Sequence, residues 1–261
     1  AQIMDIVGGE KPRPAAPWGY TNTWGNNFCL LMGWVVVAAW ASRRTLVKIL
    51  ALLCLGVSIV PAVASLNRGL WIGLGVMVLY IALRYVLMGK IWVIAAVGLA
   101  GAGLVVALAA TPLGDTVNAR LDNGKSNGVR AFLIDRAMDG FVDSPVIGYG
   151  STRTTIGGRN SITVGERAGC ERCGNFTVGG NGQLWQLLYA HGAVGTLAYL
   201  GFFGYGLWRF RRDRSAIGIA ASAAIVSSFS AMLWYNSLVT PLAFMFLAYA
   251  LLWRNEQEGK T

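Results

Sequence analysis

Arginines at two separate places in the chain have the chemistry to bind a phosphate group. Arg68 directly follows 19 uncharged residues, and Arg130 and Arg136 belong to the segment GVRAFLIDRAMDGF. A guanidinium group stays charged at any working pH and can hold two phosphate oxygens in a bidentate fork. Gly148 and Gly150 follow in the segment SPVIGYG, where glycine lets the backbone approach a ligand closely. These residues are the first candidates for a site that binds an anion.

The cysteines and the single histidine give weaker signals. Cys170 and Cys173 are separated by two residues, a spacing that favours a local disulfide in an oxidising compartment. The pair alone is too small for structural zinc, which needs four ligands, so no metal site is predicted. His191 lies in an apolar stretch, where it is either a functional group or a neutral histidine hydrogen-bonded between helices.

The composition indicates which elements position these residues. Hydrophobic residues make up 55% of the 261 residues, charged residues make up 13%, and the mean hydropathy is +0.52. A soluble domain carries about 25% charged residues. The composition therefore excludes a soluble globular enzyme, a disordered chain and a collagen-like repeat. It predicts an all-α, polytopic bundle of membrane-spanning helices.

The gaps between charged residues define the predicted spans, because a helix needs about 20 mostly apolar residues to cross a membrane. Between Lys90 and Asp115 lie 24 uncharged residues, and between Arg214 and Arg254 lie 39. The second stretch is nearly twice the bilayer thickness, so it must fold back, and a turn is readable at 235–237. The sequence predicts about seven spans, at 24–41, 46–65, 69–88, 91–110, 184–208, 216–234 and 239–253.

Lysines and arginines in the short loops set the expected orientation. Eleven of them lie on the side that contains the 209–214 cluster and the C-terminus, and they give that side a net charge of +8. This side is expected to be cytoplasmic, and Arg84 is expected to extend to the membrane interface. The basic character therefore needs no nucleic-acid partner. The first 20 residues are polar, resemble no signal peptide and are expected on the outer side, with no preceding span to place them there. We therefore expect 1–261 to be a single membrane domain, the C-terminal part of a larger protein.

The segment 111–182 breaks the pattern of short loops and is predicted to be a long extracytoplasmic loop. Within it, 128–141 places Phe132, Leu133, Arg136, Ala137 and Gly140 at helical spacing, which favours a short amphipathic helix along the membrane surface. Long loops in compact proteins are usually functional or disordered.

Four segments resemble motifs of the O-antigen ligase and O-antigen polymerase superfamily. They occur in the expected order, with the long loop between the expected helices. They are PWGYTNTWGNN at 17–27, SLNRGLW at 65–71, Arg130 with FVDSPVIGYG at 141–150, and NGQLWQLLYAHGAVG at 181–195.

This resemblance implies a GT-C-like glycosyltransferase, multi-pass in the bacterial cytoplasmic membrane. Such an enzyme transfers a glycan from a polyprenyl-diphosphate carrier to a hydroxyl of a glycan, lipid or protein, without nucleotide sugar, metal or other cofactor. Charge develops on the diphosphate as the anomeric bond breaks, and Arg68 and Arg130 are expected to converge on it. Arg136, Gly148 and Gly150 are the implied substrate-binding residues.

Asn181 departs from the family pattern, because the family has a histidine at this position. Asparagine can orient a hydroxyl group but cannot accept its proton. Either Asn181 positions the acceptor while another group takes the proton, or the chain has lost the activity and is a scaffold; a transporter or flippase-like subunit is the third possibility. The candidate bases are Asp135, Asp139, Asp143, Glu166 and Glu171.

Overall fold

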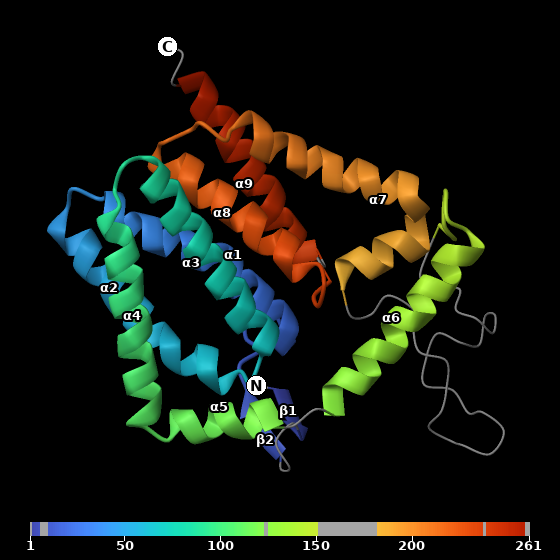
Figure 1. Ribbon diagram of the computed structural model, residues 1–261, viewed down its shortest axis with the longest axis horizontal. Helices are drawn as coiled ribbons and strands as arrows, with labels where there is room; N and C mark the ends of the chain where they lie inside the picture. The colour runs from blue at the N-terminus through green and yellow to red at the C-terminus, as the bar shows by residue number, and fades with distance from the viewer. Residues whose placement is uncertain (1, 6–9, 123–124, 151–181, 237–238, 259–261) are drawn as a thin grey trace. The chain divides into compact units, whose positions relative to one another are not determined.

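The computed structural model describes residues 2–5, 10–122, 125–150, 182–236 and 239–258, which form nine helices and one two-stranded hairpin (Figure 1). The elements are β1 (Gln2–Asp5), β2 (Glu10–Arg13), α1 (Thr21–Ala41), α2 (Thr45–Ala64), α3 (Arg68–Leu87), α4 (Trp92–Ala109), α5 (Leu113–Asp122), α6 (Lys125–Asp143), α7 (Gln183–Arg209), α8 (Ala216–Ala231) and α9 (Val239–Glu258). The chain divides into two compact units. Unit 1 consists of Ala1–Asn123, Tyr205–Ala231 and Ser237–Thr261, and unit 2 of Gly124–Gly204 and Met232–Asn236.

Helix α8 forms the centre of unit 1. It packs against α1, α3 and α9, and 11 of its 16 residues are buried. Most of these are alanine, glycine or serine, which let neighbouring helices approach closely. The fit is equally close between α1 and α3, where a Cβ added to Gly73 would lie 3.0 Å from the sulfur of Cys29. Burial on all sides is expected for a helix such as α8 that carries no polar face.

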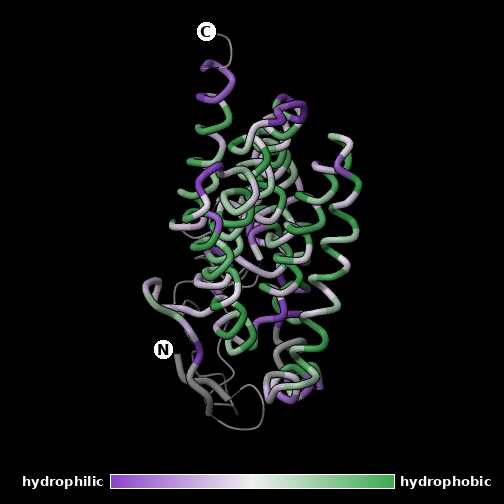
Figure 2. The backbone as a smooth tube through the Cα atoms, turned by 90° about the vertical axis from the view of Figure 1, so that its left-hand side faces the viewer, coloured by the Kyte–Doolittle hydropathy of each residue, from purple (hydrophilic) through white to green (hydrophobic). Residues whose placement is uncertain are grey.

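Helices α2 and α4 are also apolar but lie at the outside of unit 1. Leu53, Val57 and Leu99 are 59%, 72% and 75% exposed. Figure 2 shows hydrophobic residues along most of the helical path. Large exposed apolar surfaces mark contact with another apolar phase, which for helices of this length is lipid.

All seven predicted spans are helical, and five of these helices are long and apolar enough to cross a membrane. These five are α1, α2, α3, α4 and α7. Helix α8 has only 16 residues, and α9 ends in the polar sequence RNEQE. The described residues thus support a multi-pass membrane protein, while spans at α8 and α9 stay a prediction.

The described parts of the predicted loop contain two helices, α5 and α6, of which the sequence predicted only the second. Helix α6 is longer than the predicted 128–141. Its buried residues Leu133, Ala137 and Gly140 recur at helical spacing as expected. They pack within unit 2, where Ala137 contacts Tyr189. The expected position of this helix along the membrane surface stays a prediction. Most of the loop after residue 150, with Cys170 and Cys173, lies outside the described residues.

Candidate functional site

The turn between α2 and α3 carries the family-like motif SLNRGLW at 65–71. Helix α2 ends at Ala64, and the Ser65 hydroxyl donates to the carbonyl of Ala62 at 2.7 Å. Leu66 then adopts a positive φ of 54°, although it is not glycine and is almost fully buried. Such a conformation costs on the order of 1–3 kcal/mol and persists only where surrounding contacts impose it. Arg68 begins α3 directly after this turn.

Two further arginines impose the conformation of the turn. The Nε of Arg13, from β2, donates to the Ser65 carbonyl at 2.5 Å, and the Nε of Arg120, from α5, donates to the Leu66 carbonyl at 2.8 Å. Both arginines are at most 5% exposed. Together with the half-buried Arg68, they place three arginine side chains at the four consecutive residues 65–68 of unit 1. This cluster, Arg13, Arg68 and Arg120, is called the turn cluster below.

Sequence analysis identified Arg68 but missed Arg13 and Arg120. The two missed arginines lie 52 and 54 residues from the carbonyls that they bind. No local motif marks either of them, because a side chain that binds a backbone carbonyl needs no particular partner residue.

Two asparagines of α1 add buried polar groups to unit 1. Asn26 and Asn27 are 1% and 0% exposed, and within the described part of the chain no hydrogen-bond partner is found for either side-chain amide. Buried amides are normally paired, because leaving one unpaired costs about 1–3 kcal/mol. One turn before Asn26, Asn22 accepts a 3.5 Å hydrogen bond from Asn67 of the α2–α3 turn. The asparagine-rich start of α1 and the turn cluster therefore lie at the same end of unit 1.

In unit 2, the segment 144–150 fits into a break in α7. Gly192 interrupts the helix with a φ of 58° and a ψ of −162°. The N–H groups of Tyr149 and Gly150 donate to the carbonyls of Tyr189 and Ala190, before the break, at 3.0 and 2.7 Å.

After the break, the hydrogen bonds run in the opposite direction. The N–H groups of Ala193 and Val194 donate to the carbonyls of Pro145 and Val146 at 2.7 and 3.1 Å. A broken helix leaves backbone groups at both new ends without helical partners. The segment 144–150 pairs groups at both ends, so two of the family-like motifs are brought into contact.

This fit explains two glycines. A Cβ on Gly148 would lie 2.6 Å from backbone atoms of residues 189–191, and one on Gly192 would lie 2.5 Å from the carbonyl of Val146. Gly148 therefore has a packing reason in the structure, and its predicted contact with substrate stays a prediction. A Cβ on Gly150 would meet nothing within 4 Å, so packing does not account for Gly150, whose φ of 74° favours glycine.

The start of α7 is held by the segment 232–236, which contains the predicted turn. The side-chain oxygen of Asn236 accepts a 2.8 Å hydrogen bond from the N–H of Gly182. The N–H of Gln183 donates to the carbonyl of Tyr235 at 2.8 Å. Asn181 itself lies outside the described residues, so its predicted catalytic role stays a prediction. Asn236, which sequence reasoning treated only as a turn residue, fixes the backbone next to it.

The arginines of α6 differ from those of the turn cluster. Arg136 is exposed, pairs with Asp139 at 3.3 Å and lies 5.3 Å from the ring centre of Phe132. Arg130 is half-buried and belongs to unit 2, whereas Arg68 belongs to unit 1. Convergence of Arg68 and Arg130 on one diphosphate is therefore still a prediction. His191 is exposed at the break of α7, which does not match a histidine enclosed between helices.

Neither a search for metal-binding groups nor a comparison with known proteins indicates a function. Among the described residues, no group of three or more histidine, cysteine, aspartate or glutamate side chains could hold a metal ion. Comparison of the chain with protein families, curated proteins and solved structures finds no match. The family resemblance therefore depends on the four motifs alone.

Proposed function

We propose that this chain is part of a membrane glycosyltransferase similar to O-antigen ligases and polymerases. The enzyme would transfer a glycan from a polyprenyl-diphosphate carrier to a hydroxyl acceptor at the outer face of a bacterial cytoplasmic membrane. The observation that carries this proposal is the turn cluster, where Arg13 and Arg120 hold the turn that presents Arg68.

A diphosphate leaving group explains the need for such a cluster. As the anomeric C–O bond breaks, negative charge accumulates on the diphosphate oxygens, and cations already in position stabilise it. Arg68 would contact these oxygens, while Arg13 and Arg120 would act as positioning residues through the carbonyls of Ser65 and Leu66. Burial of both positioning residues supports this division, because a fixed backbone costs little reorganisation during the reaction.

The buried amides of Asn26 and Asn27 support a polar ligand near the same end of unit 1. A glycan hydroxyl or a phosphate oxygen could pair with side-chain amides that find no partner in the described part of the chain. Acceptance of the proton from the acceptor hydroxyl needs a different group, because an amide is not a base.

A transporter is the main alternative, since broken helices often form the substrate site of transporters. Helix α7 is broken at Gly192, as a transporter helix could be. However, the carbonyls of Tyr189 and Ala190 and the N–H groups of Ala193 and Val194 are bound by the segment 144–150. Because these four groups are engaged, the break favours a structural joint over a site for an ion.

The test is a transfer assay with the full protein reconstituted in vesicles. Lipid-linked glycans extracted from membranes of the source organism serve as donor, and release of polyprenyl diphosphate is followed by mass spectrometry. Arg68→Lys and Arg130→Lys should each lower the rate about a hundredfold, because lysine keeps the charge but loses the planar fork, a loss on the order of 3 kcal/mol.

The matched control is Arg43→Lys, an exposed arginine in the short α1–α2 connection, which should retain the full rate. Absence of donor consumption by the unmodified protein would contradict the proposal and favour a scaffold. Net movement of intact donor across the membrane, without cleavage, would favour a transporter instead.

A further inference from the structure

A second group of arginines lines a cavity in unit 1 that the proposed glycosyl transfer does not use. The cavity has a volume of about 370 Å³, within the usual range for small-molecule sites. It lies between the C-terminal part of α3 and the connection from α7 to α8. Its lining residues are Arg84, Leu87, Met88, Arg211, Arg212 and Arg214.

Arg84 forms the buried part of this cavity wall. It is 7% exposed, and its guanidinium donates to the Tyr80 hydroxyl at 2.9 Å, to the Ser222 hydroxyl at 3.2 Å and to the Asp213 carbonyl. The sequence predicted that Arg84 extends to the membrane interface; the structure shows its guanidinium enclosed by protein groups, and its position relative to a membrane stays a prediction. Its hydrogen bonds connect α3 with α8 and with the α7–α8 connection, and they fix its charge inside the protein.

The one acidic residue of the connection, Asp213, offsets only one of the four positive charges of these arginines. The carboxylate of Asp213 accepts hydrogen bonds from the N–H of Ser215 at 2.8 Å and from the side chain of Asn255 at 2.7 Å. In the part of the chain that the structure describes, none of the four cavity arginines forms an ion pair. The cavity is therefore positively charged, and an anion is the ligand that this charge favours.

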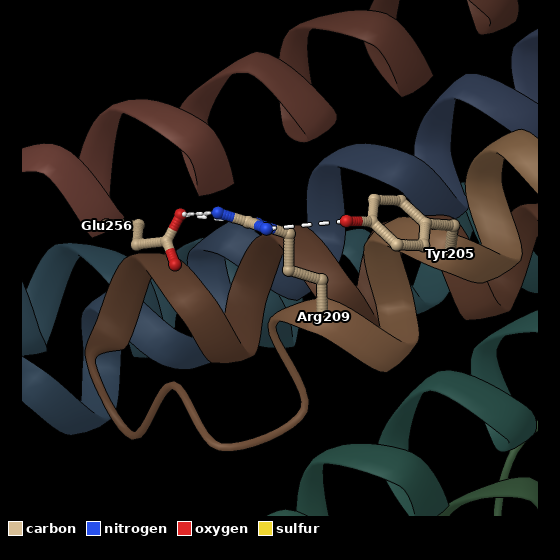
Figure 3. A network of polar contacts seen from close by, with 3 residues as sticks. All are labelled: Tyr205, Arg209 and Glu256. Atoms are coloured by element: carbon tan, nitrogen blue, oxygen red, sulfur yellow. Dashed lines mark hydrogen bonds and ion pairs between the residues drawn. The ribbon is translucent and has the colours of Figure 1, made fainter.

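The neighbouring Arg209 differs from the cavity arginines, because it forms an ion pair within the protein (Figure 3). Its guanidinium donates to the Glu256 carboxylate at 2.9 Å and to the Tyr205 hydroxyl at 3.3 Å, and lies 4.3 Å from the ring centre of Trp253. Arg211 uses one donor on the Trp208 carbonyl at 2.6 Å. Among the described residues, the side chains of Arg212 and Arg214 have no hydrogen-bond or ion-pair partner. The basic run 209–214 thus contains one structural arginine and several that remain available.

The apolar part of the wall indicates what carries the anion. Leu87 is 70% exposed, and Leu83, one turn earlier on α3, is 53% exposed. A cavity with guanidinium groups on one side and exposed leucines beside it suits an amphiphile. A soluble phosphate would gain nothing from the leucines, whereas a phospholipid would bury its first methylene groups against them.

We infer that this cavity binds the phosphate group of an anionic membrane phospholipid, with Leu87 and Met88 against its glycerol and upper acyl chains. Arg212 and Arg214 make the principal contacts with the phosphate, and Arg84 supplies a fixed charge at the inner wall. Basic pockets beside membrane helices recognise lipid headgroups in this way. The site does not depend on the proposed glycosyl transfer.

The test measures binding of single lipids to the full protein in a neutral detergent by native mass spectrometry. Dioleoyl phosphatidylglycerol is the anionic probe, and dioleoyl phosphatidylcholine is the zwitterionic reference. The double variant Arg212→Gln/Arg214→Gln should bind phosphatidylglycerol about tenfold or more weakly than the unmodified protein, because it loses two charge-assisted contacts. Binding of phosphatidylcholine should not change.

The matched control is Arg43→Gln/Arg44→Gln, which removes the same charge from exposed positions outside the cavity. It should bind phosphatidylglycerol within about twofold of the unmodified protein, since surface charges are screened. An equal loss in both double variants would show attraction by net charge alone and overturn the inference. Unchanged binding in Arg212→Gln/Arg214→Gln would overturn it as well.

A third variant and a soluble competitor separate a lipid from a free phosphate. Leu87→Ser, at an exposed position that folding should tolerate, should weaken phosphatidylglycerol binding several-fold because apolar contact is lost. Glycerol 3-phosphate carries the same phosphate without acyl chains and should not displace the lipid at equal concentration. Displacement at equal concentration would assign the cavity to a soluble anion and overturn the lipid assignment.

Discussion

The turn at 65–68 in unit 1 and the segment 144–150 in unit 2 are held by different means. Side chains hold the first, because Arg13 and Arg120 reach across more than 50 residues to its carbonyls. Backbone groups hold the second, because four hydrogen bonds join it to the two sides of the break in α7.

The two regions therefore differ in what they can do: the first can bind an anion, and the second depends on close backbone packing. Arginines that hold a turn also bring charge to it, so the turn at 65–68 combines position with the capacity to bind an anion. Hydrogen bonds between backbone groups bring no net charge and require a close approach, so 144–150 depends on glycine at positions 148 and 192. Changes in the arginines should therefore affect both stability and transfer, and changes in the glycines should affect stability first.

Gly192→Ala should give the largest effect. The new Cβ would lie 2.5 Å from the Val146 carbonyl, at a backbone conformation with φ of 58° and ψ of −162° that side chains avoid. We expect a loss of about 3 kcal/mol or more in the free energy of unfolding. The measurement is denaturant-induced unfolding of the purified protein in detergent, followed by circular dichroism.

Gly201→Ala is the control for this change, because a Cβ added to Gly201 would have no atom of another part of the chain within 4 Å. In a regular part of α7 it should leave stability unchanged or raise it by up to about 1 kcal/mol. Equal stability of the two variants would contradict the close fit of 144–150 at the break.

Arg120→Ala should have the next largest effect and would show whether the turn at 65–68 depends on its arginines. The change leaves the buried carbonyl of Leu66 without this charged donor, at a cost of about 1–3 kcal/mol in the free energy of unfolding. Transfer should fall with it, because the turn presents Arg68. Arg136→Ala, which removes an exposed arginine from an i,i+3 ion pair, should cost at most about 1 kcal/mol. A similar stability loss in both variants would argue against a special role of Arg120 in holding the turn at 65–68.

Asn27→Val would separate ligand binding from stability at the same end of unit 1. Because the Asn27 amide has no hydrogen-bond partner in the described part of the chain, an apolar replacement of comparable size should leave unfolding unchanged or stabilise the protein by up to about 1 kcal/mol. Loss of transfer without loss of stability would support contact with substrate. Asn118→Val, at an exposed position of α5, is the control and should leave transfer unchanged. Retention of full transfer in Asn27→Val would argue against a role in ligand binding.

Arg209→Lys should have the smallest effect. Lysine keeps the charge near Glu256 but loses the second hydrogen bond of the fork and the stacking on Trp253. We expect a loss below about 1 kcal/mol, since partly exposed ion pairs contribute little, and no change in transfer. Thermal unfolding in detergent measures the loss of stability, and the transfer assay measures the rate of transfer. A large loss of transfer would place Arg209 in the mechanism and weaken the role given to the turn cluster.

Much of the helical framework could be predicted from the spacing of charged residues. The seven predicted ranges are all helical, and most of their ends agree with the structure within about three residues, because short polar connections interrupt long apolar runs. The break at Gly192 was not predicted, since glycine inside an apolar helix more often serves close packing. Helix α5 was also missed, because ten residues of mixed polarity carry no clear period.

The candidate site could be predicted only in part. Arg68 stood out because it ends an uncharged stretch, whereas the Asn26 and Asn27 amides gained meaning only when their burial was known. The same holds for the basic run 209–214, which the sequence explained entirely by orientation in the membrane. The structure divides that run into Arg209, paired with Glu256, and the arginines of the cavity.

By itself, the sequence determined that this protein is helical and rich in membrane-length apolar segments, since both follow from composition and spacing along the chain. Only the tertiary structure decided which charged side chains act together. Arg13 and Arg120 reach the turn at 65–68, and Arg84 reaches the 211–214 connection, across separations of 50 to 130 residues. Hydrogen bonds and charge depend on distance in space, which residue order does not specify until the helices have packed.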